Sequence, residues 1–109
     1  LHMTSNGFHE VQYRKLRACG LFSHFDTIVL SEDAGVNKPS QAFFDYAFRT
    51  TGASPEATLM IGDNFVTDIQ GAQAAGLDVV FFNRYPDQFQ APAPVNYEIH
   101  NLKELLTIL

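Results

Sequence analysis

The sequence predicts an α/β fold in which short strands of a mainly parallel sheet alternate with helices. Short apolar runs such as Thr27–Leu30 and residues 58–61 are typical of buried strands. Amphipathic segments separate them, and one carries phenylalanines at residues 43, 44 and 48 ahead of a glycine that can end a helix. With 109 residues, the chain has room for one small domain.

The first half of the chain is expected to contain two strands and two helices. A break at Ser5-Asn6-Gly7 separates the first strand from the first helix. Ser40 can cap the second helix, and Gly52 can end it. Lys38 directly precedes Pro39, which disfavours helical backbone at Lys38 and favours a loop there. The expected elements are a strand at residues 1–4, a helix at 8–19, a strand at 25–30, a loop at 31–38 and a helix at 40–51.

The second half is expected to contain three strands and two helices. They are preceded by a turn or short helix at residues 54–56 and interrupted by a surface loop at 87–94. The strands are expected at residues 58–61, 79–82 and, as a short edge strand, 97–99, and the helices at 66–75 and 102–109. Leucines at positions 102, 105, 106 and 109 follow the spacing of one helical face, and Asn101 can cap that helix.

Composition and charge weigh against several classes of protein. The formal net charge is −5 and no basic cluster interrupts the acidic balance, which argues against nucleic-acid binding. The single cysteine, Cys19, cannot form an internal disulfide and is expected to be a packing residue. No apolar run approaches the roughly 20 residues that a membrane-spanning helix needs. We therefore expect a cytoplasmic protein that binds neither nucleic acid nor a membrane.

One group of polar residues lies after the first predicted strand and in the loop after the second. Ser5, Asn6 and Gly7 follow the first strand, and Lys38 ends the loop that leaves the second. In a parallel sheet such loops collect at one edge, where ligands bind. The Ser5 hydroxyl and nearby backbone N–H groups can donate to phosphate oxygens at a helix N-terminus. Lys38 can offset negative charge in a transition state, so these residues are candidates for holding a phosphoryl group.

Two acids follow the strand expected at residues 58–61. Gly62 ends the apolar run abruptly, Asp63 comes next, and Asp68 stands in the first turn of the expected helix. Carboxylate oxygens are ligands that Mg²⁺ prefers. Asp63 can ligate such an ion, and Asp68 can ligate it directly or orient its waters. The sequence therefore favours a magnesium site at the same edge of the sheet.

Each of these residues also has a purely structural explanation. Ser5 or Asn6 can cap the following helix, and Asp68 can be a first-turn acid favoured by the helix dipole. Asp63 can be a turn residue, and Lys38 can be a solvated surface side chain. Their order along the chain and their placement on one predicted edge favour the functional interpretation over these separate explanations.

The same residues form a series that resembles three motifs of the haloacid dehalogenase (HAD)-like hydrolase superfamily, within its phosphatases that carry an inserted helical cap. Residues 3–7, Met-Thr-Ser-Asn-Gly, match the second motif, a hydrophobic strand that ends in Ser or Thr before Asn-Gly. Residues 36–39, with a Lys before a Pro, match the third. Residues 61–63 followed by Asp68 match the fourth. Residues 5–8 and 31–39 look most like the bacterial pyrimidine 5′-nucleotidases.

The resemblance implies a Rossmann-like (HAD-like) parallel sheet with helices on both faces, in which residues 1–109 form the C-terminal part of the core domain and lack the first strand and the cap. It implies a phosphomonoesterase that acts on a small phosphorylated metabolite, such as a nucleoside monophosphate, through an aspartyl-phosphate. Mg²⁺ would be held by Asp63 and Asp68. The implied phosphate-binding residues are Ser5, Asn6, Gly7 and Lys38, and all but Gly7 are also implied in catalysis.

The chain departs from the family pattern in one respect that matters for activity. The family's first motif, Asp-x-Asp, supplies the nucleophile and the general acid and base, and this sequence contains no such motif. We therefore expect the isolated chain to be inactive and to bind Mg²⁺ weakly. In the family, the missing strand lies between the strands that here end at Ser5 and Ile61. We expect that gap to be closed by direct pairing of those strands, by a second chain as in a homodimer, or by an N-terminal fragment.

Three alternatives remain. The chain could be a non-catalytic HAD-like domain that serves binding or regulation, which the sequence upstream of Leu1 would decide. A metal-independent haloacid dehalogenase is disfavoured by Asp63 and Asp68, because a metal-free site gains little from two carboxylates that face an anionic substrate. A phosphoryl-accepting signalling domain would need a central acceptor Asp, and none is suitably placed.

Overall fold

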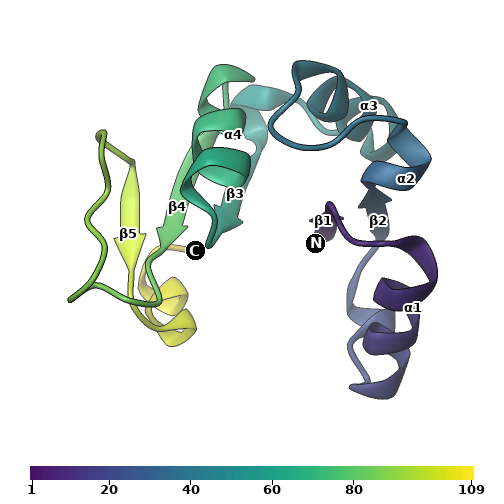
Figure 1. Ribbon diagram of the computed structural model, residues 1–109, viewed down its shortest axis with the longest axis horizontal. Coiled ribbons are helices and arrows are strands. Elements are labelled where there is room, and N and C mark those ends of the chain that lie inside the picture. Colours follow the sequence, from purple (N-terminus) through teal and green to yellow (C-terminus); the bar gives the residue numbers. More distant parts are fainter. The chain divides into compact units, whose positions relative to one another are not determined.

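The computed structural model describes all residues from 1 to 109, and the chain forms two compact units, Leu1–Ser54 and Pro55–Leu109 (Figure 1). Each unit combines parallel strands with helices, as the α/β prediction requires. No helix in either unit has the length and apolar character needed to cross a membrane.

Unit 1 contains a two-stranded parallel sheet with one helix in the connection. Strand β1 (His2–Ser5) pairs with β2 (Thr27–Leu30), and helix α1 (His9–Ala18) lies between them in the chain. The register places Ser5 opposite Leu30, so both strands end at the same edge of the sheet. The two strands and the first helix predicted for this half of the chain are confirmed, and their ends differ from the prediction by at most two residues.

The segment after β2 differs from the prediction. Residues 31–38, expected to be a loop, begin with a short helix, α2 (Ser31–Ala34), which ends at Gly35 in the left-handed conformation. Helix α3 (Gln41–Thr51) follows and ends at Gly52, as predicted. The predicted side-chain cap at Ser40 is wrong, because that residue precedes the helix without a capping hydrogen bond from its side chain.

Apolar side chains from strand β2 and from helices α1 and α3 form the core of unit 1. Phe43 and Phe44 of α3 are buried and meet edge to face, with ring centroids 5.7 Å apart. The other buried apolar residues are Leu16, Val29, Leu30 and Ala47. Burial of such large side chains is the main source of stability for a sheet of only two strands.

Unit 2 contains a three-stranded parallel sheet in the order β3-β4-β5, formed by Leu59–Gly62, Asp78–Phe82 and Tyr97–Ile99 (Figure 1). Strand β5 is at the edge, as predicted. Gly62 pairs with Phe81, so β3 and β4 also end at a common edge. Short 3₁₀ turns at Phe22–His24 in unit 1 and Pro55–Ala57 in unit 2 complete the connections.

The helix expected at residues 66–75 is present but irregular. It begins as a π-helical segment, Phe65–Gln70, and continues as α4 (Gly71–Ala74). The carbonyl of Asn64 accepts from the N–H groups of both Asp68 and Ile69, at 2.9 and 3.3 Å, which widens the first turn. Such widened turns are rare and are frequently found at functional sites.

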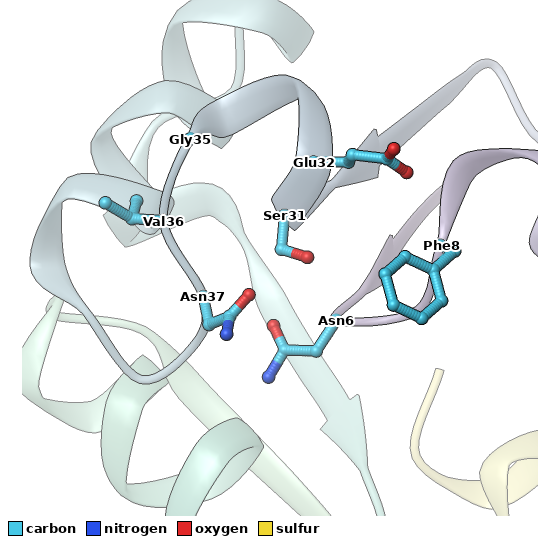
Figure 2. A pocket seen from close by; sticks show the side chains of 7 residues that line it. All are labelled: Asn6, Phe8, Ser31, Glu32, Gly35, Val36 and Asn37. Carbon is cyan, nitrogen blue, oxygen red and sulfur yellow. The ribbon is translucent and has the colours of Figure 1, made fainter.

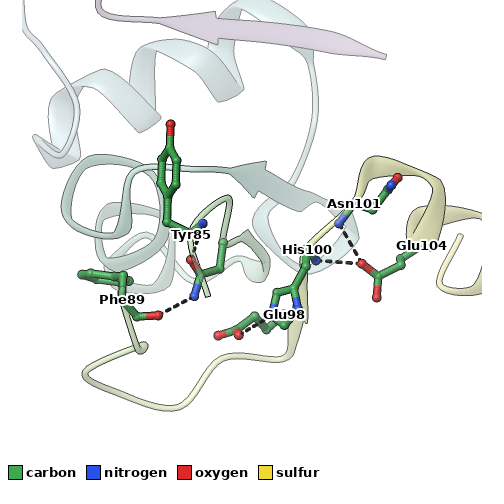
Figure 3. Close-up of polar contacts among 7 residues, drawn as sticks. Tyr85, Phe89, Glu98, His100, Asn101 and Glu104 are labelled. Carbon is green, nitrogen blue, oxygen red and sulfur yellow. Dashed lines mark hydrogen bonds and ion pairs between the residues drawn. The ribbon is translucent and has the colours of Figure 1, made fainter. Parts of the chain in front are cut away.

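The last helix also differs from the prediction. It is a 3₁₀ helix, Leu102–Thr107, rather than an α-helix that reaches residue 109. Asn101 caps it as predicted, and Glu104 completes a reciprocal capping box (Figure 3). Because a 3₁₀ helix has three residues per turn, leucines spaced by four no longer share a face, and Leu106 is 83% exposed.

Direct pairing of the strand that ends at Ser5 with the strand before Asp63 was one of three expected ways to close the gap, and the sheets do not contain it. β1 is hydrogen-bonded to β2 and β3 to β4, in two separate sheets. The edges left by these sheets offer unpaired backbone groups, which proteins ordinarily cover.

Candidate functional site

The first group of candidate residues, in unit 1, lies in the turn that follows β1. Ser5 ends the strand, and its Oγ accepts a hydrogen bond from the N–H of Gly7 at 2.9 Å. This bond fixes the turn and the position of the hydroxyl, while the O–H of Ser5 keeps its ability to donate to an anion. The backbone N–H of Gly7, in contrast, is already used within the turn.

Asn6 connects this turn to Lys38, which is 32 residues away in the sequence. The side-chain amide of Asn6 donates to the carbonyl of Lys38 at 3.1 Å, and its Oδ1 accepts from the N–H of Lys38 at 2.8 Å. The peptide bond from Lys38 to Pro39 is cis. The structure therefore brings together two of the residues that the sequence predicted for one sheet edge.

The side chain of Lys38 is buried rather than solvated. The residue is 8% exposed, and its Nζ lies 3.4 Å from Oγ1 of Thr4, on β1. An ammonium group shielded from water interacts more strongly with a nearby anion than an exposed one does. This placement argues against the explanation of Lys38 as an ordinary surface residue.

A pocket of about 410 Å³ opens beside this turn. Figure 2 shows the side chains of Asn6 and Asn37 pointing toward one another across it, with the ring of Phe8 at its side. The remaining lining residues are Ser31, Glu32, Gly35 and Val36. The pocket thus adjoins the predicted phosphate-binding residues and mixes polar groups with one exposed aromatic ring.

Glu32 is a residue of this region that the sequence prediction missed. Its Oε2 accepts from the backbone N–H of His9, the first residue of α1, at 2.6 Å. Phe8 precedes α1 without a capping side chain, so Glu32 supplies the cap from another helix. A helix predicted at residues 31–34 would have identified Glu32 as a candidate, because a helix turns one side of that segment toward the turn after β1.

A second group of candidate residues lies in unit 2, directly after β3. The side chain of Asp63 is 51% exposed, and its Oδ2 lies 3.5 Å from Nη1 of Arg84. Arg84 was not singled out from the sequence, although it follows the strand expected at residues 79–82 just as Asp63 follows its strand. The rule that selected the other candidates, a polar residue at a parallel strand end, would have found it.

Asp68 is buried and held in place by its own loop. It is 7% exposed, its Oδ2 accepts from the N–H of Asn64 at 3.2 Å, and its Oδ1 lies 3.5 Å from Oγ1 of Thr67. Gly62 makes room for it, because a Cβ atom at residue 62 would lie 2.4 Å from Cβ of Asp68. Asn64 fixes the other side of the loop by accepting from the N–H groups of residues 66 and 67.

The side-chain oxygen atoms in this loop are of the type that binds a hard divalent cation. Asp63 and Asp68 offer carboxylate oxygens within one loop, and oxygen is the ligand type that Mg²⁺ prefers. No group of three or more His, Cys, Asp or Glu side chains that could hold a metal ion occurs in the chain. Two carboxylates supply only part of the six ligands of octahedral Mg²⁺, so further oxygens from water or elsewhere are required.

Comparison with known sequences agrees with the motif pattern. A family model described as haloacid dehalogenase-like hydrolase matches residues 1–76. The HAD-hydrolase YfnB of Bacillus subtilis is 43% identical over 112 residues, which cover 100% of this chain and 47% of that protein. The pyrimidine 5′-nucleotidase PynA of Streptococcus pneumoniae is 33% identical over 100% of this chain and 46% of its own length. The chain therefore spans about half the length of the curated relatives it matches.

Comparison with solved structures shows the same fold. The crystal structure of YfnB bound to magnesium matches with a TM-score of 0.89 and 41% identity, over 99% of this chain and 47% of that one. A 2-haloacid dehalogenase from Pseudomonas syringae matches with a TM-score of 0.83 and 31% identity, over 99% of this chain and 45% of that one. Both matches support a Rossmann-like parallel arrangement of strands and helices in this chain.

Proposed function

Because this chain belongs to the haloacid dehalogenase-like hydrolase family, we propose that it is the C-terminal part of a Mg²⁺-dependent phosphomonoesterase. The observation that carries the proposal is the pair of hydrogen bonds between the side chain of Asn6 and the backbone of Lys38. It fixes a buried cation beside a turn whose serine hydroxyl can donate to an anion. A small phosphorylated metabolite is the proposed substrate, and the similarity to a pyrimidine 5′-nucleotidase favours a nucleoside monophosphate.

The proposed roles in unit 1 follow from the chemistry of the side chains. The ammonium group of Lys38 attracts the phosphoryl oxygens and stabilises the charge that they carry in the transition state. The hydroxyl of Ser5 donates to one of those oxygens. Asn6 contributes by fixing the backbone of Lys38, and Gly7 by holding the Ser5 hydroxyl in place.

The proposed roles in unit 2 concern the metal. Asp63 would hold Mg²⁺ through its exposed carboxylate, and Asp68, fixed by the N–H of Asn64, would ligate the ion or orient its waters. When bound, the ion would neutralise negative charge on the substrate. The structure of the relative YfnB bound to magnesium supports this assignment by similarity.

The nucleophile of the proposed reaction does not belong to this chain, which has no Asp-x-Asp sequence. We propose that the chain alone is inactive and that an N-terminal segment or a second chain supplies the missing carboxylates and covers an open sheet edge. The dehalogenase alternative is not favoured: dehalogenases share the fold, but the curated relatives named above are a hydrolase and a nucleotidase.

Two measurements on the chain test this proposal. In an NMR titration with inorganic phosphate, we expect the amide signals of residues 5–7 and Lys38 to shift, and we expect Lys38→Ala to weaken binding by about tenfold or more, as for loss of a charged hydrogen-bonding group. Signals that shift elsewhere, or that shift equally in the variant, would refute the phosphate site.

The second measurement is an assay of the chain with p-nitrophenyl phosphate and Mg²⁺, in which we expect no turnover. Turnover that disappears in Lys38→Ala would show that the chain is active by itself.

A further inference from the structure

We propose that Arg84 is a positioning residue for Asp63, whose carboxylate it holds when no metal ion is present and for which it competes with a divalent cation. This inference rests on the proposed function, in which Asp63 is a metal ligand. Metal binding is then the replacement of one cation by another at the same carboxylate, and Arg84 sets how readily the loop accepts the ion.

The contact between the two side chains is direct and easily broken. Nη1 of Arg84 lies 3.5 Å from Oδ2 of Asp63, and the two side chains are 54% and 51% exposed. An ion pair in contact with water contributes little, so a better cation can displace it. Mg²⁺ concentrates two charges on a small ion, whereas the guanidinium spreads one charge over a plane. Both draw on the same carboxylate, and the dication has the stronger attraction.

The sheet of unit 2 places the two residues next to each other. Strands β3 and β4 run parallel, and Gly62 pairs with Phe81 near their ends. Asp63 follows β3 directly, and Arg84 follows β4 after Asn83. The strand register therefore brings the two loops close enough for the side chain of Arg84 to reach Asp63.

The backbone on either side of Arg84 is anchored. Asn83 is 3% exposed, and its N–H donates to the carbonyl of Ile99 at 2.9 Å. Its side-chain amide donates to the carbonyl of Phe89 at 2.8 Å, and its Oδ1 accepts from the N–H of Tyr85 at 3.1 Å (Figure 3). The ring of Tyr85 lies 5.7 Å from the guanidinium carbon of Arg84, where a cation–π attraction adds to its placement.

An aromatic cluster connects the loop of Arg84 to the loop of Asp63. The rings of Phe65 and Phe81 meet edge to face at 5.2 Å, and Phe89 contacts Phe81 at 5.7 Å and Phe65 at 6.3 Å. Phe65 begins the helical segment that follows Asp63, and Phe89 belongs to the loop after Arg84. The two loops therefore pack on one shared aromatic cluster.

The charge balance of unit 2 adds to the importance of Arg84. Beyond residue 55 the only Lys and Arg residues are Arg84 and Lys103, among a larger number of acids. Replacing Arg84 by a neutral residue removes the positive charge next to Asp63, so a dication approaches a carboxylate that is less compensated. The expected direction is therefore tighter metal binding.

Mn²⁺ binding to the chain tests the inference without any assay of activity. The probe is Mn²⁺ itself, titrated into isotopically labelled protein at low salt, with broadening of the amide signals of residues 63–68 as the readout. We expect Arg84→Gln to bind Mn²⁺ about two- to fivefold more tightly than the natural chain, the range that an exposed ion pair accounts for. Arg84→Lys keeps the charge and is expected to restore the natural affinity. A merely structural role for Arg84 would lower the unfolding temperature without tightening Mn²⁺ binding.

The outcomes separate this inference from the proposed function. An unchanged or weaker Mn²⁺ affinity in Arg84→Gln would overturn the inference alone. If Asp63→Asn binds Mn²⁺ as well as the natural chain, Asp63 is not a metal ligand, and the proposed function fails together with the inference. Loss of Mn²⁺ binding in Asp63→Asn with tighter binding in Arg84→Gln is the result that both predict.

Discussion

The side-chain amide of Asn6 and the backbone of Lys38 exchange two hydrogen bonds, at 3.1 and 2.8 Å. A single asparagine thus matches both backbone groups of a residue that lies 32 positions further along the chain. Only an amide side chain has a donor and an acceptor placed for this exchange. The contact explains why a turn after β1 and a loop before α3 form one site.

Replacing Asn6 with alanine should therefore destabilise unit 1. Loss of two hydrogen bonds, each worth about 0.5–1.5 kcal/mol, should lower the free energy of unfolding by about 1–3 kcal/mol. Urea denaturation followed by circular dichroism measures this change. Asn37→Ala is the matched control, because Asn37 lines the same pocket with an exposed side chain. Equal stability of the two variants would show that the Asn6–Lys38 contact does not hold the site together.

Gly62 should tolerate no side chain. A Cβ atom there would lie 2.4 Å from Cβ and 2.6 Å from Oδ2 of Asp68, and the buried Asp68 has little room to move. Gly62→Ala should lower the free energy of unfolding by about 1–3 kcal/mol, the usual cost of overpacking.

Gly7→Ala provides the comparison for Gly62→Ala. The new Cβ would meet the flexible side chain of Gln12, which can rotate away. We expect its cost to stay below about 1 kcal/mol, as for a substitution that a flexible neighbour accommodates. A larger loss for Gly7→Ala than for Gly62→Ala, measured by the same urea denaturation, would contradict the packing of Asp68 against Gly62.

Glu32 should stabilise the start of α1. Glu32→Ala removes the acceptor of the His9 N–H and a negative charge near the helix N-terminus, which together should cost about 0.5–2 kcal/mol. Hydrogen exchange at the first amides of α1 should speed up. Asp33→Ala removes the same charge from the same short helix and should leave those amides unaffected. Comparable acceleration by both variants would show that the effect is a general one of charge.

Stability should depend on pH through Glu104. Backbone N–H groups of His100 and Asn101 donate to its carboxylate and lower the pKa of Glu104 below its ordinary value of 4.5 (Figure 3). Because the folded pKa lies below the unfolded one, the carboxylate stabilises the fold above about pH 4.5, and this contribution is lost as the pH falls through the folded pKa.

The difference in unfolding midpoint between the natural chain and Glu104→Gln should therefore be present at pH 6 and should shrink in acid. Glu56→Gln, which removes a carboxylate elsewhere in unit 2, is the control for general charge effects. A difference that stays constant from neutral to acidic pH would show that the capping box of Asn101 and Glu104 does not depend on the ionised carboxylate.

The sequence predicted the strands and the meeting of Asn6 with Lys38 because both follow from local pattern. Apolar runs such as Thr27–Leu30 form strands with the predicted centres, and Asn6 lies beside Lys38 because loops after parallel strands meet at one edge. The short helix at Ser31–Ala34 was missed because its polar residues carry no apolar periodicity. The widened turn after Asn64 forms because one carbonyl accepts hydrogen bonds from two N–H groups, and the spacing of apolar residues does not predict this.

Other features depend on contacts between distant residues. The cap that Glu32 provides for α1 joins two elements 23 residues apart, and the pairing of Arg84 with Asp63 requires the register of β3 and β4. The leucine spacing at the C-terminal end predicted an α-helix, but a 3₁₀ helix follows the capping box of Asn101 and Glu104. Hydrophobic spacing alone does not distinguish these two helices over six residues.

Complementation tests the central claim, that this chain provides half of a phosphomonoesterase site, most directly. The chain is mixed with the part of the Streptococcus pneumoniae nucleotidase that it does not match, and hydrolysis of uridine 5′-monophosphate is measured with Mg²⁺. The positive control combines that nucleotidase's own two parts. We expect no turnover by this chain alone or by the nucleotidase part alone, turnover when the two are mixed, and its loss when the chain carries Lys38→Ala or Asp63→Asn. Turnover with the control parts but none with this chain, or turnover that both variants retain, would contradict the account.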